Sequence, residues 1–292
     1  MRGWLIVNPF LDTKKFQEIY GLLCASAKAE GMELEMKTAA ELMCPSGDDF
    51  ARFHLPDFAI FWDKDVYLAK RLEKAGVRLF NSAAAVEGCD NKILTAMALN
   101  AAHVPTPKTF FSPKTFEGLG YKNLAFLDAA EKEVGYPMVI KEAYGSFGQQ
   151  VYLANSRAEA EKIIAGLGYK DFIMQEFIAS SRGRDIRVNV VGGKVVACML
   201  RYNEQDFRSN ISNGGSMKNW EITPRQEAAA LAACKALSLD FAGVDVMFGE
   251  KDAPIICEVN SNPHFKSTLE ATGIDLSRHI MQHIRQVITC ED

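Results

Sequence analysis

Two alternating segments near the C-terminus constrain the fold of this chain most strongly. Within residues 243–260, Gly-Val-Asp-Val-Met-Phe and Ile-Ile-Cys-Glu-Val-Asn each alternate like a half-buried strand, and the residues between them have the composition of a turn. A hairpin that closes symmetrically about this turn puts Asp245 opposite Glu258. Asn260 then shares the face of Glu258, because side chains in a strand repeat every second residue.

Facing carboxylates in a hairpin have two interpretations. Like charges directly opposite each other destabilise a β-ladder, and a bound divalent cation removes that penalty. Carboxylate and amide oxygens suit a hard cation, so Asp245, Glu258 and Asn260 are candidate ligands of Mg²⁺, or of Mn²⁺, beside a nucleotide phosphate. Removing either carboxylate is then expected to leave the fold intact. The alternative is a solvated hairpin that carries acidic residues, and the spacing alone favours neither.

Length and composition are those of an ordinary globular protein. The 292 residues suffice for about two domains with a sizeable core, and the net charge of −4 argues against nonspecific binding to nucleic acid. No apolar run is long enough to span a bilayer, and the apolar stretch at residues 4–7 ends without a cleavage site, so it predicts a first strand. The seven scattered cysteines, without a CxxC pair, indicate reduced thiols in a cytoplasmic protein.

The first 80 residues alternate between strand and helix patterns. The expected elements are strand 4–7, helix 14–29, strand 33–37, strand 58–62, helix 66–75 and strand 77–80. This alternation predicts an α/β domain whose parallel sheet is covered by helices. No GxGxxG follows the first strand, so no dinucleotide site is predicted there.

The remaining chain mixes helices with hairpins. Asp90 is the expected N-cap of a helix that runs to about Ala102, and Gly192-Gly193 predicts a tight hairpin. Two capping boxes begin helices, at Ser156 to Glu159 and at Thr223 to Gln226. The other expected elements are strands 109–111, 138–142, 150–154, 172–177, 186–191 and 194–201, and helices 124–134 and 276–287.

A lysine and a glycine-bearing loop lie together after an apolar strand. Lys141 precedes Gly145, Ser146, Phe147 and Gly148. Glycine lets backbone N–H groups approach phosphate oxygens, and the lysine adds a positive charge. The loop lacks the ending of a Walker A motif, and an ordinary strand–turn–strand hairpin is the more frequent structure for such a segment.

A second segment passes from apolar to polar and back, with Gln175 and Glu176 followed by Phe177 and Ile178. It could line a flat slot for adenine and bind the edge of the base through its backbone. An edge strand with two exposed polar residues is the alternative.

Polar side chains then share one face of the next strand. Asp185 is placed to bind a ribose hydroxyl, and Arg187 to bind a phosphate or carboxylate with both arms of its guanidinium. A solvated face with a cross-strand salt bridge is the alternative. Further on, three hydrogen-bonding side chains enter a glycine-rich turn that is either a phosphate-contacting loop or a surface loop: Arg208, Ser209 and Asn210.

The order of these motifs resembles that of the ATP-grasp superfamily, and within it the RimK-type ligases that add glutamate or other amino acids to a carboxylate. The resemblance runs from about Asp90 to Asp275, and the first 85 residues look like the smaller α/β domain that usually precedes this fold. It implies a parallel-sheet α/β domain followed by two α+β lobes with antiparallel sheets, at residues 1–88, 89–178 (glycine loop and hinge) and 179–292 (metal site).

The resemblance also implies roles for the motif residues. Lys92 and Lys141 would contact ATP phosphates beneath the glycine loop, and residues 175–178 would hold the adenine, with Asp185 on the ribose side. Arg208, Ser209 and Asn210 match a nucleotide-contacting loop. Asp245, Glu258 and Asn260 match the magnesium ligands, with Glu258 bridging two ions.

The implied reaction joins a small-molecule or peptide carboxylate to an amino-acid amine through an acylphosphate, with release of ADP and phosphate. Arg187 would steady the acylphosphate, and Arg208 would add positive charge at the transferring phosphoryl group. Homo-oligomers are ordinary for such enzymes. A kinase and a non-catalytic nucleotide-binding protein are the alternatives.

The chain departs from the family pattern at two places. Gln149-Gln150 follows the glycine loop where a further glycine is usual, and Ser261 to Phe265 replaces a small residue, Pro and Gly. His264 is therefore expected near the carboxylate end of the site, where it either binds substrate or is structural. His279 and His283 are spaced for one helix face, which favours a structural explanation over a metal site.

Overall fold

The computed structural model describes residues 1–48, 50–145, 148–211 and 214–291. Its first sheet contains β1 (Arg2–Val7), β2 (Glu33–Thr38), β3 (Phe58–Trp62) and β4 (Arg78–Phe80). The strands are parallel in the order β2-β1-β3-β4, and α1 (Lys14–Ala29) and α2 (Val66–Lys74) connect them. The predicted α/β arrangement at the N-terminus is therefore confirmed.

The helix expected after Asp90 is present, and a further helix that the sequence did not predict precedes it. Asp90 ends α3 (Ala83–Asp90), and α4 (Lys92–Ala101) follows after one residue. Asn91 is the N-cap, because its Oδ1 accepts hydrogen bonds from the backbone N of Ile93 at 2.9 Å and of Leu94 at 3.4 Å. The prediction that Asp90 caps the helix was wrong, since the carboxylate of Asp90 pairs with Lys64 instead.

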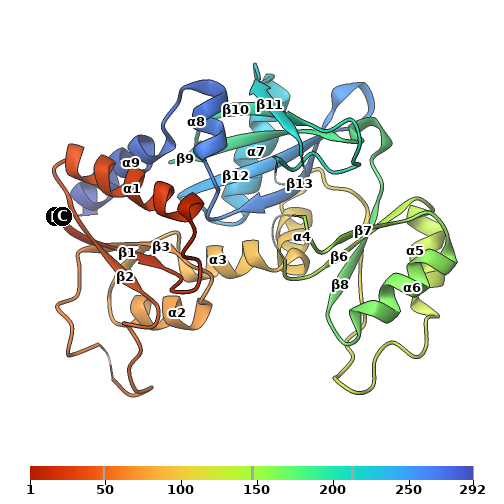
Figure 1. Cartoon of the computed structure of the whole chain (residues 1–292), viewed down its shortest axis with the longest axis horizontal. Helices are drawn as coiled ribbons and strands as arrows, with labels where there is room; N and C mark the ends of the chain where they lie inside the picture. Colours follow the sequence, from red (N-terminus) through yellow and green to blue (C-terminus); the bar gives the residue numbers. More distant parts are fainter. Residues whose placement is uncertain (49, 146–147, 212–213, 292) are drawn as a thin grey trace.

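The second sheet is antiparallel and forms the central lobe, on the right in Figure 1. Its strands are β5 (Thr109–Phe111), β8 (Phe172–Glu176), β6 (Met138–Glu142) and β7 (Val151–Ala154), in that order, and its helices are α5 (Phe126–Val134) and α6 (Arg157–Leu167). Ser156 caps α6 as predicted, but the Glu159 carboxylate accepts from Asn155 N at 2.8 Å rather than from Ser156. The first capping box is thus half formed.

The third sheet is also antiparallel. Its strands are β11 (Ser216–Asn219), β10 (Lys194–Tyr202), β9 (Arg184–Val191), β12 (Phe241–Phe248) and β13 (Pro254–Asn260), in that order. The helix α7 (Pro224–Ala236) packs on this sheet and begins with the complete capping box of Thr223 and Gln226. Asp245 pairs with Glu258 as predicted. A β-bulge leaves Cys257 unpaired beside them, because Val246 pairs with Ile256.

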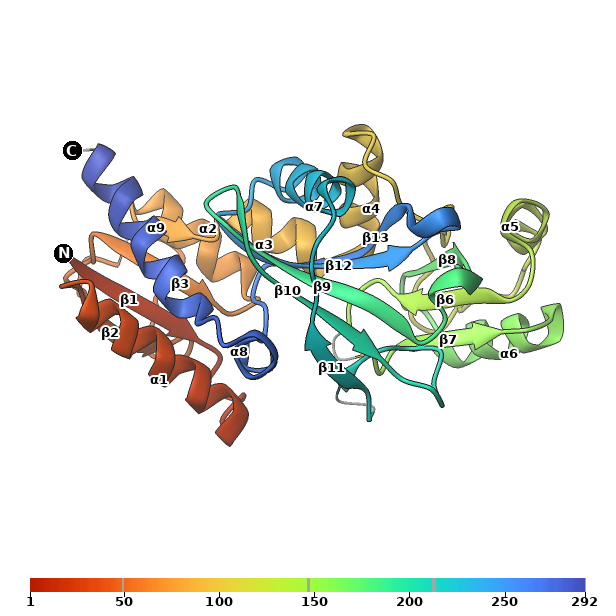
Figure 2. The same ribbon diagram turned by 90° about the horizontal axis from the view of Figure 1, so that it is seen from above.

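The last helix returns to the N-terminal sheet. After α8 (Lys266–Thr272), α9 (Leu276–Glu291) packs against α1, as Figures 1 and 2 both show. One hydrophobic cluster joins Leu5 and Leu23 to Ile280 and Ile284. Each sheet draws its strands from one of the three predicted ranges, and the domain boundaries themselves stay predictions. None of the described helices is both long and apolar enough for a membrane span.

Asn81 attaches the first sheet to the third. Its side chain is fully buried, and its Nδ2 donates to the carbonyls of Phe241 and Ser261, each at 2.9 Å. Its Oδ1 accepts from the backbone N of Asp240 at 2.7 Å. Trp62, at the end of β3, stacks on the Phe241 ring with centroids 5.6 Å apart. The N-terminal sheet is therefore held against the ends of β12 and β13.

Candidate active site

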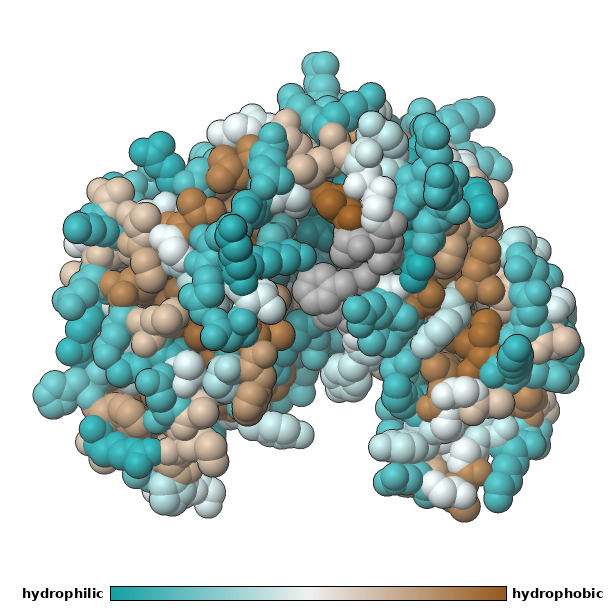
Figure 3. Space-filling model, in the orientation of Figure 1, coloured by the Kyte–Doolittle hydropathy of each residue, from teal (hydrophilic) through white to brown (hydrophobic). Residues whose placement is uncertain are grey.

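A cavity of about 530 Å³ is lined by residues from all three sheets and their loops. On the face shown in Figure 3, the surface is indented between the N-terminal part and the central lobe. The cavity walls contain most of the described residues that the sequence singled out: Lys92, Lys141, Gly145, Gly148, Gln175, Glu176, Phe177, Ile178, Asp185, Arg187, Arg208, Ser209, Asn210, Asp245, Glu258 and Asn260. Ser146 and Phe147 lie outside the described residues.

One end of the cavity is formed where β8 ends. Because β8 lies between β5 and β6, the alternative of an exposed edge strand is wrong. The N–H of Glu176 donates to the Lys108 carbonyl at 2.9 Å, while among the described residues the N–H groups of Phe177 and Ile178 have no backbone acceptor. Val139 and Met247 add apolar walls. This end combines a flat apolar surface with free backbone donors.

The glycine loop connects β6 to β7, so it is the turn of a hairpin that also lines the cavity. Lys92 Nζ donates to the Gly145 carbonyl at 3.1 Å. Burial lowers the pKa of Lys92, and attraction to Glu258 partly opposes this effect. A Cβ on Gly145 would lie 2.7 Å from Oε1 of Gln150, so that glutamine occupies the space beside the loop.

Arg208 links this loop to the C-terminal lobe. Its Nη1 donates to the Gly148 carbonyl at 2.6 Å, and its Nη2 pairs with the Asp206 carboxylate at 2.7 Å. The hydrogen bond from Arg208 lowers the pKa of Asp206, which therefore stays ionised. The guanidinium at the cavity wall is thus already partly neutralised.

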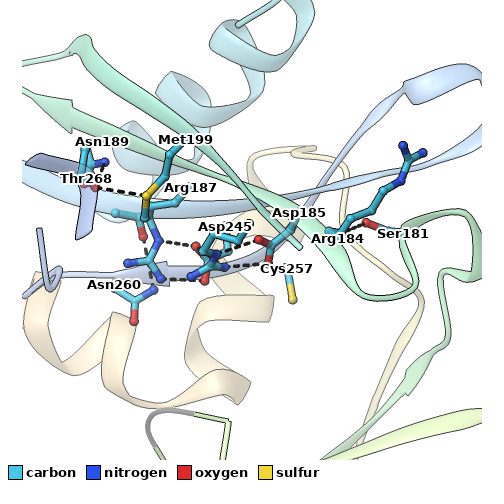
Figure 4. A network of polar contacts seen from close by, with 12 residues as sticks. Ser181, Arg184, Asp185, Arg187, Asn189, Met199, Asp245, Cys257, Asn260 and Thr268 are labelled. Carbon is cyan, nitrogen blue, oxygen red and sulfur yellow. Dashed lines mark hydrogen bonds and ion pairs between the residues drawn. The ribbon is translucent and has the colours of Figure 1, made fainter. Parts of the chain in front are cut away.

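A buried network of two arginines and two aspartates lies at the centre of the site. Arg187 binds both carboxylate oxygens of Asp245, one of them at 2.9 Å, as Figure 4 shows. Arg201 binds both oxygens of Asp185, at 2.8 and 2.6 Å, and its Nη2 lies 3.0 Å from Asp245. The alternative of a solvated face with a cross-strand salt bridge is half correct. Arg187 does form a cross-strand salt bridge, but the bridge is not solvated, because Asp245 is only 4% exposed.

This network changes the interpretation of the facing carboxylates. Burial alone would raise the pKa of Asp245, but Arg187 and Arg201 more than offset this effect and lower it. Two arginines therefore balance the charges of Asp185 and Asp245, and Asp245 needs no cation to be stable in the hairpin. The expectation that removing Asp245 leaves the fold intact stays a prediction, and these ion pairs argue against it, because Arg187 would lose its carboxylate partner.

Glu258 and Asn260 differ from Asp245. Among the described residues, the Glu258 carboxylate forms no hydrogen bond or ion pair, and it faces the cavity. Asn260 uses only its Nδ2, which donates to the Gly243 carbonyl at 3.3 Å, so its Oδ1 is available. No three His, Cys, Asp or Glu side chains in the described ranges form a metal cluster. The oxygen atoms that are available to bind a cation are therefore the Glu258 carboxylate and the Asn260 amide oxygen.

The sequence did not single out Arg201. It pairs with Asp185 across the β9–β10 hairpin, but a β-bulge at Val196 shifts the register by one residue. Counting from Gly192-Gly193 without the bulge puts Leu200 opposite Asp185, so the pattern carried no signal for this contact. Two of the histidines have different surroundings. His283 Nε2 lies 2.9 Å from the Asp240 carboxylate, whereas His264 lines the cavity.

Solved structures with the same architecture identify the fold. The chain superposes with a TM-score of 0.75 on the D-alanine–D-alanine ligase from Bacillus anthracis, at 19% identity and over all of both chains. The TM-score is 0.72 for a RimK-domain ATP-grasp protein from Sphaerobacter thermophilus, at 21% identity over 97% of this chain and 99% of the other. The three-sheet architecture around the cavity is the ATP-grasp fold.

Sequence similarity then identifies the family. Residues 89–284 match the RimK-like ATP-grasp domain. The chain is 37% identical over 224 residues to the probable alpha-L-glutamate ligase 2 of Shewanella amazonensis. The matched stretch covers 76% of this chain and 71% of that protein. The chain therefore belongs to the RimK-like ATP-grasp family.

Proposed function

We propose that this protein is an ATP-dependent carboxylate–amine ligase that forms an amide bond through an acylphosphate. One observation carries the proposal. A single cavity contains, from end to end, a hinge with free backbone donors, two lysines with a glycine loop, and a cluster of arginines beside oxygen ligands. Family membership and the name of the Shewanella relative support the same reaction class.

The nucleotide would lie along this cavity, whose volume is within the usual range of about 300–1,000 Å³ for ligand pockets. The N–H groups of Phe177 and Ile178 would bind the adenine edge. Lys92, Lys141 and the glycine loop would bind the phosphates, because both lysines line the cavity together with Gly145 and Gly148. Asp185 would lie on the ribose side, although its carboxylate is occupied by Arg201.

We assign Asp245, Glu258 and Asn260 as ligands of Mg²⁺ or Mn²⁺. The open oxygens of Glu258 and Asn260 fit a hard cation, and a triphosphate would compete with Asp245 for its arginines. When bound, the ion would neutralise charge on the phosphate oxygens.

The arginines carry the charge stabilisation that the chain itself supplies. A carboxylate reacts poorly with amines, so transfer of the γ-phosphoryl group of ATP onto it creates a good leaving group. Arg187 would steady the resulting acylphosphate, and Arg208 would stabilise charge at the transferring group. The neutral amine then attacks the acyl carbon, phosphate leaves and the nitrogen releases a proton, so that the products are the amide, ADP and phosphate.

ADP release measured with pairs of carboxylates and amino acids tests the proposal. Glutamate is the first amine to try, since the Shewanella relative is named as a glutamate ligase. We expect ADP and an amide, seen by mass spectrometry, only when both substrates are present. A stable phosphorylated product that needs no amine would indicate a kinase and contradict the ligase.

A further inference from the structure

Three polar atoms at the end of the cavity farthest from the hinge have no partner. Asp63 Oδ2, Asn262 Oδ1 and His264 Nε2 are shielded from solvent and unsatisfied among the described residues. All three residues line the cavity, and the Asp63 residue is only 5% exposed. Buried polar groups in native proteins are nearly always satisfied, so three orphans at one end of a cavity point to a missing ligand.

The fold builds this end from two distant segments. Asp63 follows β3, and its Oδ1 is already used by Asn8 Nδ2 at 3.1 Å and by the Lys64 backbone N at 2.6 Å. Asn262 follows β13 and donates through Nδ2 to the Asp63 carbonyl at 3.1 Å. This hydrogen bond joins the two segments directly, and Asn81 Nδ2 also donates to the Ser261 carbonyl beside Asn262, so the orphan atoms are fixed in place.

His264 adds a neutral acceptor. Burial, followed by the nearby charges of Lys15 and Arg187, lowers its pKa to about 4, so the ring is uncharged at neutral pH. A neutral imidazole has one nitrogen that accepts a hydrogen bond. The ring also packs edge-on against Phe16, with centroids 6.3 Å apart, which limits its rotation.

We propose that Asp63, Asn262 and His264 form an amine subsite that binds the primary ammonium of an amino acid. An ammonium has three N–H donors and one positive charge, and the subsite offers acceptor atoms together with the charge of Asp63. Lys15, whose charge acts on His264, also lines the cavity and would attract the carboxylate of that amino acid. The assignment rests on the proposed ligase, because it names the amine that the ligase consumes.

Isothermal titration of the full chain, with ADP and MgCl₂ present, tests the subsite by binding alone. The probes are the twenty common L-amino acids, the N-acetyl forms of those that bind, and ethylamine. We expect at least one amino acid to bind, its N-acetyl form to bind at least about tenfold more weakly, and ethylamine to bind more weakly than the amino acid. Equal binding of the free and acetylated forms, or no binding by any amino acid, would overturn the proposal.

Asp63→Asn removes the charge while keeping an oxygen for Asn8 and Lys64. We expect the affinity for the amino acid to fall about ten- to hundredfold while ADP affinity stays unchanged. Asp12→Asn is the matched control, since Asp12 is an exposed aspartate outside the cavity lining that contacts Gln17. If both variants bind the amino acid alike, the subsite is wrong.

His264→Phe provides a second test should Asp63→Asn fail to fold. It keeps the ring against Phe16 but removes the acceptor, so we expect several-fold weaker amino-acid binding; unchanged binding would overturn the role of His264. ADP release distinguishes the two proposals. Asp63-dependent amino-acid binding without ADP formation would contradict the ligase and support the subsite. Amine-dependent ADP formation that Asp63→Asn leaves unchanged would support the ligase and contradict the subsite.

Discussion

At the scale of single residues, the two facing carboxylates of the hairpin have different surroundings. Asp245 is buried and held by two arginines, whereas Glu258 faces the cavity without an ion-pair partner among the described residues. The same acidic pattern therefore has two energetic roles. Asp245, although also a proposed metal ligand, is paired with arginines in the sheet, whereas Glu258 is free to act on a ligand.

This difference predicts different effects on stability for two similar substitutions. Glu258→Gln should leave the melting temperature nearly unchanged and lower the rate of ADP formation by about 100-fold or more, because it removes a proposed metal ligand. Asp245→Asn should lower the free energy of unfolding by about 3–5 kcal/mol, because Arg187 loses its carboxylate partner and Arg201 keeps only Asp185. Urea unfolding and a coupled ADP assay measure both; equal stability of the two variants would contradict the network.

His264 predicts a pH dependence of stability. Its pKa is about 4 in the folded chain and ordinarily 6.5, so the unfolded chain binds the extra proton in this interval. Stability should be complete above pH 6.5 and fall as the pH decreases towards 4, by about 3 kcal/mol at most. Urea unfolding of wild type and His264→Phe between pH 4 and 7 measures this; parallel curves would exclude His264 as the source.

At the scale of elements, close packing between β12 and the segment after β13 positions the site. Gly243 lies on β12, where a Cβ would be 2.8 Å from Pro263 Cβ and 3.0 Å from Arg187 Cδ. Only glycine allows this approach without movement of the proline or the arginine. The absence of a side chain at Gly243 therefore leaves the space that the Arg187 side chain occupies.

Gly243→Ala should cost about 1–3 kcal/mol of stability through overpacking and should lower the rate of ADP formation by displacing Arg187. Gly21→Ala is the matched control, because Gly21 is exposed on α1 and has open space beside it. We expect that change to stabilise the protein by about 0.5–1 kcal/mol. Thermal unfolding compares them, and a neutral Gly243→Ala would contradict the packing argument.

At the scale of the whole molecule, Asn81 and α9 hold the N-terminal sheet on the C-terminal lobe. Asn81 bonds to two backbone segments, at residues 240–241 before β12 and at Ser261 after β13, and α9 extends the core of the first sheet. The end of the cavity that contains Asp63 depends on this attachment.

Asn81→Ala should therefore reduce the free energy of unfolding by at least about 2 kcal/mol, because it leaves several buried backbone groups unsatisfied. It should also weaken amino-acid binding more than ADP binding, since ADP would lie towards the other end. Urea unfolding and titration calorimetry measure the two effects. An equal loss of both affinities would indicate general destabilisation instead.

Much of the fold was readable from the chain because the signals are local. The turn composition around residues 249–254 and the period-two alternation on either side predicted the pairing of Asp245 with Glu258. Helix α1 began and ended where its apolar stripe and Gly31 indicated. The cap of α4 was misplaced by one residue, since Asp90 and Asn91 are both good N-caps and only the end of α3 distinguishes them.

The sequence by itself determined the strands, the hairpins and the order of the motifs, because each depends on neighbouring residues. Tertiary structure decided which arginine pairs with which aspartate. The bulges at Val196 and Cys257 leave no pattern in the sequence, yet the first brings Arg201 opposite Asp185 and the second accompanies the pairing of Asp245 with Glu258. Asp63 and Asn262 come together only because the first sheet packs against the third, and no local preference encodes a contact between segments 199 residues apart.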